Sequence, residues 1–272
     1  MGTLQSSGPV PGPRVVWTVA LGLAALIVPA WTYLIVMAWG MVHMDVGMGM
    51  LLMPRMTGWQ ATDLALVFLM WVVMMAAMML PSVVPMVRAF RSVAARSRAG
   101  SSPGSLAAFI AGYLALWTGF SAVATLLQWV WLEAEWITPM MAVRSPVAGA
   151  ALLLAAGLYQ FTPLKDVCLG RCRSPLGFLL SAWRPGLAGA WMLGLRHGAW
   201  CTGCCWMLMA LLFVFGVMNV AWIVALTAFV VLEKSWPARW GGGRAVSRLA
   251  GAALVAWAGV LLLGAAGAPG AA

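Results

Sequence analysis

Residues 197–215 read HGAWCTGCCWMLMALLFVF, and they join metal-binding residue types to an apolar helix. They hold one of the two histidines and three of the five cysteines in the chain. On a helix with 3.6 residues per turn, His197, Cys201 and Cys205 are successive i, i+4 neighbours, and Cys204 lies beside them. Such neighbours have Cβ atoms about 5–6 Å apart, so two of them can chelate one ion.

A second pair of thiols lies upstream, where the same four-residue spacing recurs in DVCLGRCR at residues 166–173. Thiolate together with imidazole suits Zn(II), Cu(I) and other soft ions. A four-ligand site would take one or two ligands from each cluster, although neither spacing is that of a zinc finger. Thiol redox chemistry and simple apolar packing are the alternatives. We predict a metal site built from Cys168, Cys172, His197, Cys201, Cys204 and Cys205.

The composition is that of a polytopic membrane protein. Of the 272 residues, 64% are hydrophobic and 8% are charged, whereas a soluble domain has about 25% charged residues. The net charge of +10 comes from basic residues in short loops between apolar runs. Such loops indicate membrane topology rather than nucleic-acid binding. The predicted fold class is an all-α transmembrane helical bundle in a single domain.

Seven apolar runs are predicted to cross the membrane, at about 15–39, 63–87, 106–132, 147–161, 199–217, 220–232 and 249–263. Residues 1–14 and 265–272 are predicted tails, the first of them disordered, and residues 164–196 a cysteine-containing segment at the cytoplasmic surface. With the N-terminus inside and the C-terminus outside, fourteen of the sixteen Lys and Arg residues fall on the inner side. This matches the positive-inside rule. The short fourth run and the tight turn after the fifth leave a re-entrant pair as an alternative to two spans.

The turn between the fifth and sixth runs brings an acid to the depth of the cysteines. Cys201 lies sixteen residues before Val217 and Glu233 lies sixteen after it, so antiparallel helices place them at one level. A carboxylate at this depth is costly unless it is paired. We predict that Glu233 is a hard metal ligand, a partner of His197, or half of an ion pair with Lys234 or a loop arginine.

The chain also contains 20 methionines, whose thioethers bind Cu(I) without deprotonation. One group lies in a loop that the predicted topology places outside, and another lies on the second span. Core packing is the plainer interpretation for methionines at helical spacing. The candidate copper contacts are His43, Met44, Asp45, Met48 and Met50 in the loop, and Met70, Met74, Met75, Met78 and Met79 on the span.

Four stretches resemble the signature blocks of an uncharacterised bacterial family, domain of unknown function 2182, described as a predicted metal-binding integral membrane protein. They are MWVVMMAAMMLP (70–81), YQFTPLKDVCLGRCR (159–173), GLRHGAWCTGCCWMLM (194–209) and MNVAWIVALTAFVVLEK (218–234). The resemblance extends from about Met37 to Pro237 and implies metal binding by the five cysteines and His197. It supplies no substrate or reaction. A family of this kind implies the inner membrane of a bacterium as the location.

These patterns predict a membrane protein that binds and handles a thiophilic metal, with copper favoured over zinc. The outer loop would capture the ion, the second span would pass it inward, and the Cys/His cluster would receive it. No ATP-binding P-loop is present, so facilitated movement fits, as does loading of a metallochaperone or a partner membrane subunit. The alternatives are a metal-dependent membrane oxidoreductase, a thiol redox or sensor protein, and a structural subunit.

Overall fold

The computed structural model describes residues 13–43, 58–96, 104–138, 141–236 and 242–266. Within these ranges the chain is helical, and its one β feature is an isolated bridge between Ile137 and Val143. The predicted all-α fold is confirmed for this part of the chain. The predicted loop contacts at 44–50 lie outside the described residues, and His43 is placed only as the last residue of the first helix.

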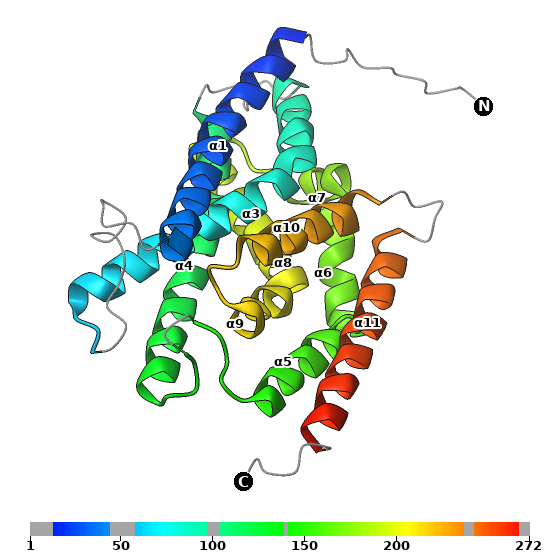
Figure 1. The fold of residues 1–272 in the computed structure, drawn as a ribbon. Coiled ribbons are helices and arrows are strands. Elements are labelled where there is room, and N and C mark those ends of the chain that lie inside the picture. Colours follow the sequence, from blue (N-terminus) through cyan, green and yellow to red (C-terminus); the bar gives the residue numbers. More distant parts are fainter. Residues whose placement is uncertain (1–12, 44–57, 97–103, 139–140, 237–241, 267–272) are drawn as a thin grey trace.

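Figure 1 shows how the helices pack against one another. In chain order they are α1 (Pro13–His43), α3 (Ala61–Arg96), α4 (Ser105–Glu133), α5 (Pro146–Tyr159), α6 (Pro163–Arg173), α7 (Pro175–Ala182), α8 (Gly186–Ala210), α9 (Leu212–Phe215), α10 (Val220–Ser235) and α11 (Gly242–Ala266).

Local capping sets the ends of the short helices around the centre. The side chain of Ser145 accepts a hydrogen bond from the Ala148 amide, and that of Thr162 accepts one from the Lys165 amide. A proline follows each cap, where its missing N–H costs nothing. Gly216, at φ +88°, makes the turn between α9 and α10 that the sequence predicts.

Five spans among the described helices are long and apolar enough to cross a membrane: those in α1, α3, α4 and α11, and the one formed by α8 with α9. A sixth results if α5 and α6, bent by 63° at their junction, count as one span. The predicted sixth run corresponds to α10, whose 16 residues are fewer than the roughly 20 that a bilayer core needs. The structure supports a membrane protein, while seven spans and their orientation stay a prediction.

The fifth predicted span is the largest correction. The sequence predicts its start at residue 199, after the basic Arg196, but α8 begins at Gly186. Arg196 is exposed on the helix flank while His197 turns inward, so one continuous helix carries both. Residues 186–196 are therefore not part of a surface segment. Cys201 therefore lies fifteen residues after the first residue of α8, about 22 Å along the helix axis, and not at the N-terminal end of the helix.

The other predicted runs each fall on one helix, with differences at their polar ends. α3 continues to Arg96 and α11 begins at Gly242. The basic residues predicted in loops at 88–96 and 244–248 therefore belong to helices, because arginine is a good helix former and its long stem packs along apolar surface. Of the predicted tails, residues 13–14 belong to α1 and residues 265–266 to α11.

α4 and α8 run parallel to each other in close contact. A Cβ atom at Gly112 would overlap the carbonyl oxygen of Trp191, and one at Gly194 would overlap that of Phe109. Small residues at such contacts allow membrane helices to pack backbone to backbone. This contact fixes the position of α8 against α4, and Cys201 of α8 contacts Tyr113 of the same neighbour.

Replacing Gly112 by Ala is expected to lower the thermal unfolding temperature of the detergent-solubilised protein. Overpacking of this kind costs about 1–3 kcal/mol. Gly119, on the same helix, is the matched control because a Cβ atom there meets nothing within 4 Å. Gly119→Ala should leave the unfolding temperature unchanged or raise it, since Ala is the better helix former. Equal unfolding temperatures for the two variants would contradict the importance of the α4–α8 contact.

Candidate metal centre

The two predicted cysteine clusters meet in one buried region. The thiol of Cys172 on α6 lies near the thiols of Cys201 and Cys204 on α8. Cys205 is also a near neighbour of Cys201 and Cys204. The three thiols of α8 are fully buried, and Cys172 is nearly so. The structure therefore brings the cysteine-bearing helices α6 and α8 together, and a joint thiol site stays a prediction.

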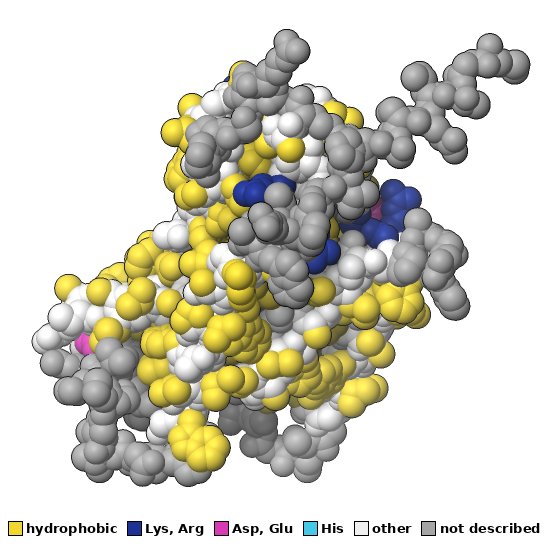
Figure 2. Space-filling model, turned by 90° about the horizontal axis from the view of Figure 1, so that it is seen from above, with side chains coloured by type: hydrophobic (Ala, Val, Ile, Leu, Met, Phe, Trp, Pro, Cys, Tyr) yellow, Lys and Arg dark blue, Asp and Glu magenta, His cyan; other side chains and the backbone are white. Residues whose placement is uncertain are grey.

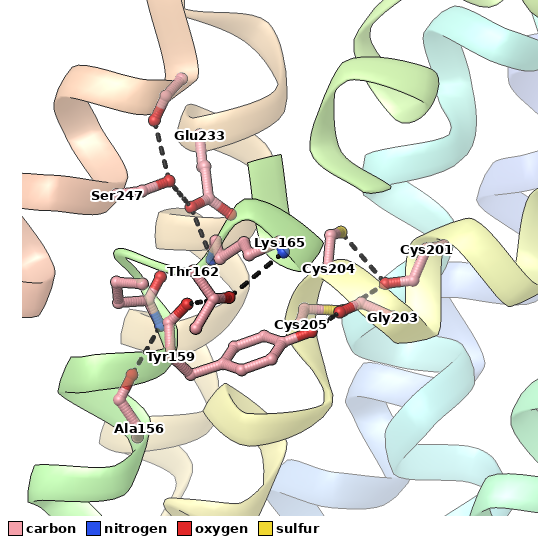
Figure 3. Close-up of polar contacts among 12 residues, drawn as sticks. Ala156, Tyr159, Thr162, Lys165, Cys201, Gly203, Cys204, Cys205, Glu233 and Ser247 are labelled. Atoms are coloured by element: carbon pink, nitrogen blue, oxygen red, sulfur yellow. Dashed lines mark hydrogen bonds and ion pairs between the residues drawn. The ribbon is translucent and has the colours of Figure 1, made fainter. Parts of the chain in front are cut away.

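Cys168, one turn before Cys172, lies at the edge of this cluster. Its Sγ packs against Gly203, where a Cβ atom would come within 2.9 Å of the sulfur. The hydroxyl of Tyr159 donates to the carbonyl oxygen of Gly203 from the other side (Figure 3). Gly203 thus gives α6 and α5 room to approach α8. All five cysteines carry free thiols.

The Cys201 sulfur has polar neighbours from two other helices, α10 and α4. Lys234 of α10 places its Nζ 3.0 Å from the Cys201 Sγ and 3.0 Å from the Ser82 Oγ of α3. The Tyr113 hydroxyl of α4 lies 3.2 Å from the same sulfur. The Lys234 ammonium at this distance is placed to balance negative charge on the sulfur, and the thiolate is the form that binds metals.

The other two thiols of α8 turn toward their own helix. Cys204 and Cys205 donate to the carbonyl oxygen of Cys201, at 3.1 and 2.9 Å (Figure 3). Throughout the described ranges, no three His, Cys, Asp or Glu side chains stand in an arrangement that could hold a metal ion. The thiols are therefore close together, but their rotamers do not form a closed metal site.

His197 lies among aromatic rings rather than among the thiols. Its imidazole is 3% exposed and lies against the rings of Tyr113, Phe109 and Phe178, at centroid separations of 5.7, 6.2 and 5.7 Å. Its Nδ1 has no hydrogen-bond partner in the described part of the chain. The ring is thus packed as a core residue, and its place among the ligands stays a prediction.

Glu233 forms an ion pair with Lys165, which was not among its predicted partners. Its Oε1 lies 2.7 Å from the Nζ of Lys165 on α6, with both side chains fully buried, and it accepts a hydrogen bond from Ser247 of α11 (Figure 3). An ion pair was one predicted role, but the partner is Lys165 rather than the predicted Lys234 or a loop arginine. Consecutive helical residues point about 100° apart, so Lys234 faces the Cys201 thiol while Glu233 faces α6 and α11.

The polar groups around the thiols were missed for identifiable reasons. The basic runs of the sequence assign Lys165 and Lys234 to loops, although the depth argument that singled out Glu233 applies equally to the next residue. Tyr113 is one of three tyrosines, which is a weak signal of a buried hydroxyl. Ser82 has no distinguishing sequence pattern.

The predicted methionines of α3 lie in the core. The carbonyl oxygen of Met79 accepts a hydrogen bond of 3.2 Å from the Tyr113 hydroxyl, which also contacts Cys201. The methionine row and the thiol cluster are thus joined through one side chain. Burial fits core packing as well as copper contact, so the second role stays a prediction. At most 2% of the residue surface is exposed for Met70, Met74, Met75, Met78 and Met79.

Breaking the buried ion pair is expected to destabilise the protein strongly. Glu233→Gln leaves the Lys165 ammonium without its counter-ion, a change that costs about 3–5 kcal/mol. Glu135→Gln is the matched control because Glu135 pairs with Arg144 at 3.7 Å on the surface, where a pair contributes about 1 kcal/mol or less. Thermal unfolding in detergent measures both variants.

A double variant separates the charge effect from packing. Lys165→Met with Glu233→Leu removes both charges together, and it is expected to be more stable than either single variant. If Glu233→Gln unfolds at the same temperature as Glu135→Gln, the ion pair does not have the structural effect assigned to it.

A sequence comparison with known families now bears on this site. The model of a family described as PpoB2, copper chaperone, matches residues 68–261. The matched range begins in α3, ends in α11 and contains every cysteine of the chain, together with the two buried lysines and Glu233. No curated protein and no solved structure matches the chain. The match agrees with the metal-related role that the earlier resemblance implied, under a different family description.

Proposed function

The chain belongs to the PpoB2 copper-chaperone family, and from this premise we propose that it is an integral membrane protein whose cargo is Cu(I). The buried thiols hold the ion and pass it to an acceptor. The observation that carries the proposal is the convergence of four thiols from α6 and α8 in one buried region. Soft thiolate ligands suit both Cu(I) and Zn(II), and the family description favours copper.

The open arrangement of the thiols suits a cargo that is held briefly. Cys204 and Cys205 must rotate away from the Cys201 carbonyl oxygen before they can bind an ion. A site that rearranges on binding gives up part of its affinity, because ordering the ligands costs free energy. Structural zinc sites, in contrast, are closed four-coordinate sites. The cluster therefore fits transient binding of Cu(I) better than permanent binding of Zn(II).

Lys234 is the proposed counter-cation of the bound cargo. One Cu(I) ion on two thiolates has a net charge of −1, which a single ammonium cancels. A buried charge without such a partner costs several kcal/mol. The Nζ of Lys234 lies 3.0 Å from the Cys201 Sγ, and the neighbouring Glu233 is already paired with Lys165. Lys234 is thus the nearest cation to the proposed cargo.

The methionines of α3 extend the proposed path of the ion. They lie between the start of α3 and Ser82, which contacts Lys234. From Met70 to Ser82 the axial distance is about 18 Å. In the proposed topology, with the N-terminus inside the bacterial inner membrane, this row leads from the outer side to the thiols. A metallochaperone or a partner membrane subunit would receive the copper.

The decisive experiment measures copper bound to the purified protein after loading with Cu(I). Wild type is expected to retain copper. The double variant Cys201→Ser/Cys205→Ser is expected to retain about tenfold less copper per protein, because the substitutions remove two of the four neighbouring thiols. Ser121→Ala is the matched control, since Ser121 is equally buried and bonds only within α4. Size-exclusion chromatography checks that each variant is folded. Wild-type protein without copper, or an unchanged copper content in the double variant, would contradict the proposal.

A second experiment tests the charge of Lys234. Lys234→Met is expected to weaken Cu(I) binding by about 10- to 100-fold, since a hydrogen bond to a charged group contributes about 1.5–3 kcal/mol. Lys234→Arg keeps the charge and should retain most of the affinity. Competition with a Cu(I) chelator measures both. If the two variants bind copper equally, the positive charge is not what Lys234 contributes.

A further inference from the structure

A cavity of about 410 Å³ lies between α6 and α11, apart from the thiol cluster. Both helices contribute charged side chains to it, and its lining contains no cysteine. The lining residues are Asp166, Leu169, Gly170, Arg173 and Ser174 from α6 and its end, and Gly242 and Arg244 from the start of α11.

The two arginines of the cavity are held in different ways. Arg173 donates to the carbonyl oxygen of Trp236 at the end of α10, and its guanidinium lies where a side chain at Gly242 would be. The Arg244 side chain is 66% exposed, and its Nε lies 3.6 Å from the Asp166 Oδ2. In the described part of the chain Arg244 has no further ionic or hydrogen-bond partner. One arginine is therefore fixed, and the other is available to a ligand.

The charges of the cavity match a phosphodiester. Arg173 and Arg244 contribute two positive charges and Asp166 one negative charge, which leaves a balance of +1. A phosphodiester has a single negative charge at neutral pH, and the guanidinium group binds phosphate oxygens through two parallel N–H donors. Figure 2 shows Lys and Arg side chains at several places on one face of the molecule, with hydrophobic side chains exposed around them.

The cavity lies at the end of a candidate membrane span. That span begins at Gly242, so Arg244 is in its first turn. α6 runs antiparallel to α11, because Arg173 lies at Gly242 while Gln160, before the start of α6, lies at Gly251. Exposed apolar side chains are found along this helix pair. They include Phe161, which precedes α6 and contacts Gly251 of α11, and Leu249 of α11, exposed by 48 and 73%.

We propose that this cavity binds the headgroup of an anionic phospholipid. Arg173 and Arg244 bind the phosphodiester, and the acyl chains lie along the exposed apolar side chains of α6 and α11. Basic pockets between membrane helices bind such headgroups. A zwitterionic lipid has the same phosphodiester but adds a cation, which the two arginines repel. The inference requires insertion in a membrane but does not depend on copper binding.

A headgroup bound in this cavity would contact α6, the helix that contains Cys168 and Cys172. Asp166 and Arg173 face the cavity, whereas their preceding neighbours, Lys165 and Cys172, face Glu233 and the thiols of α8. One side of α6 thus contacts the lipid while the other side lines the thiol cluster. Lipid binding would therefore hold α6 against α11 and keep its cysteines in place.

The test is a titration of the purified full-length protein in detergent with phosphatidylglycerol, phosphatidylcholine or inorganic phosphate, followed by native mass spectrometry. Wild type is expected to bind phosphatidylglycerol about fivefold more tightly than phosphatidylcholine, the ratio that corresponds to one basic group near a membrane surface. Inorganic phosphate at the same concentration should not displace the lipid, because it lacks the acyl chains.

Variants with opposite expected effects sharpen this test. Arg244→Gln should lower the affinity for phosphatidylglycerol about fivefold, and Asp166→Asn should raise it by a similar factor. Arg88→Gln, an exposed arginine of α3, is the control and should bind as wild type does. Equal binding of the two lipids, or an unchanged preference in Arg244→Gln, would overturn the inference. Displacement by inorganic phosphate would identify a site for free anions instead. A protein that takes up no copper but prefers phosphatidylglycerol would refute only the proposed function.

Discussion

The buried ion pair between Lys165 and Glu233 is the constraint on which the thiol cluster depends. It ties α6 to α10, and Ser247 ties α11 to the same carboxylate. Such a pair adds little net stability, because desolvation of both ions offsets their attraction. Its main effect is on arrangement, since a shift of either helix would leave an unpaired charge in apolar surroundings. α6 is thereby held in the one position that brings Cys172 to the thiols of α8.

α8 is held in turn by its glycine contacts with α4. The backbones touch at Gly112 and Gly194, so α8 has little freedom to rotate or slide. The cluster thus lies between two rigid contacts, one of backbone against backbone and one of charge against charge. The freedom that remains is in the χ1 angles of the cysteines, two of which turn back to the Cys201 carbonyl oxygen. A rigid frame around rotatable thiols is consistent with the proposed uptake and release of an ion.

The helical fold and the identity of the cysteine-bearing stretches could be predicted, because hydrophobic period and composition are local properties. The start of α8 could not, since Arg196 on its exposed flank imitates a helix boundary. The partner of Glu233 could not either, because Lys165 is 68 residues away and a contact over that distance leaves no local pattern. His197 and Cys201 do lie one turn apart on the same helix, as predicted. The spacing does not decide in which direction the imidazole ring points. Here aromatic rings of α4 and α7 surround it.

Lys234 gives a physical reason for a monovalent cargo. Its neighbour Glu233 is neutralised by Lys165, and within the described residues the groups that contact the Lys234 ammonium are Ser82 and Cys201. A hydroxyl and a neutral thiol do not balance a buried positive charge, so the region is most stable when the sulfur bears the compensating negative charge. Exchanging a thiol proton for Cu(I) replaces one monovalent cation by another and leaves the total charge unchanged. Exchanging it for Zn(II) adds a positive charge, which must be offset by deprotonating a further thiol. The fixed charge of Lys234 therefore favours the exchange of a proton for Cu(I) in this buried cluster.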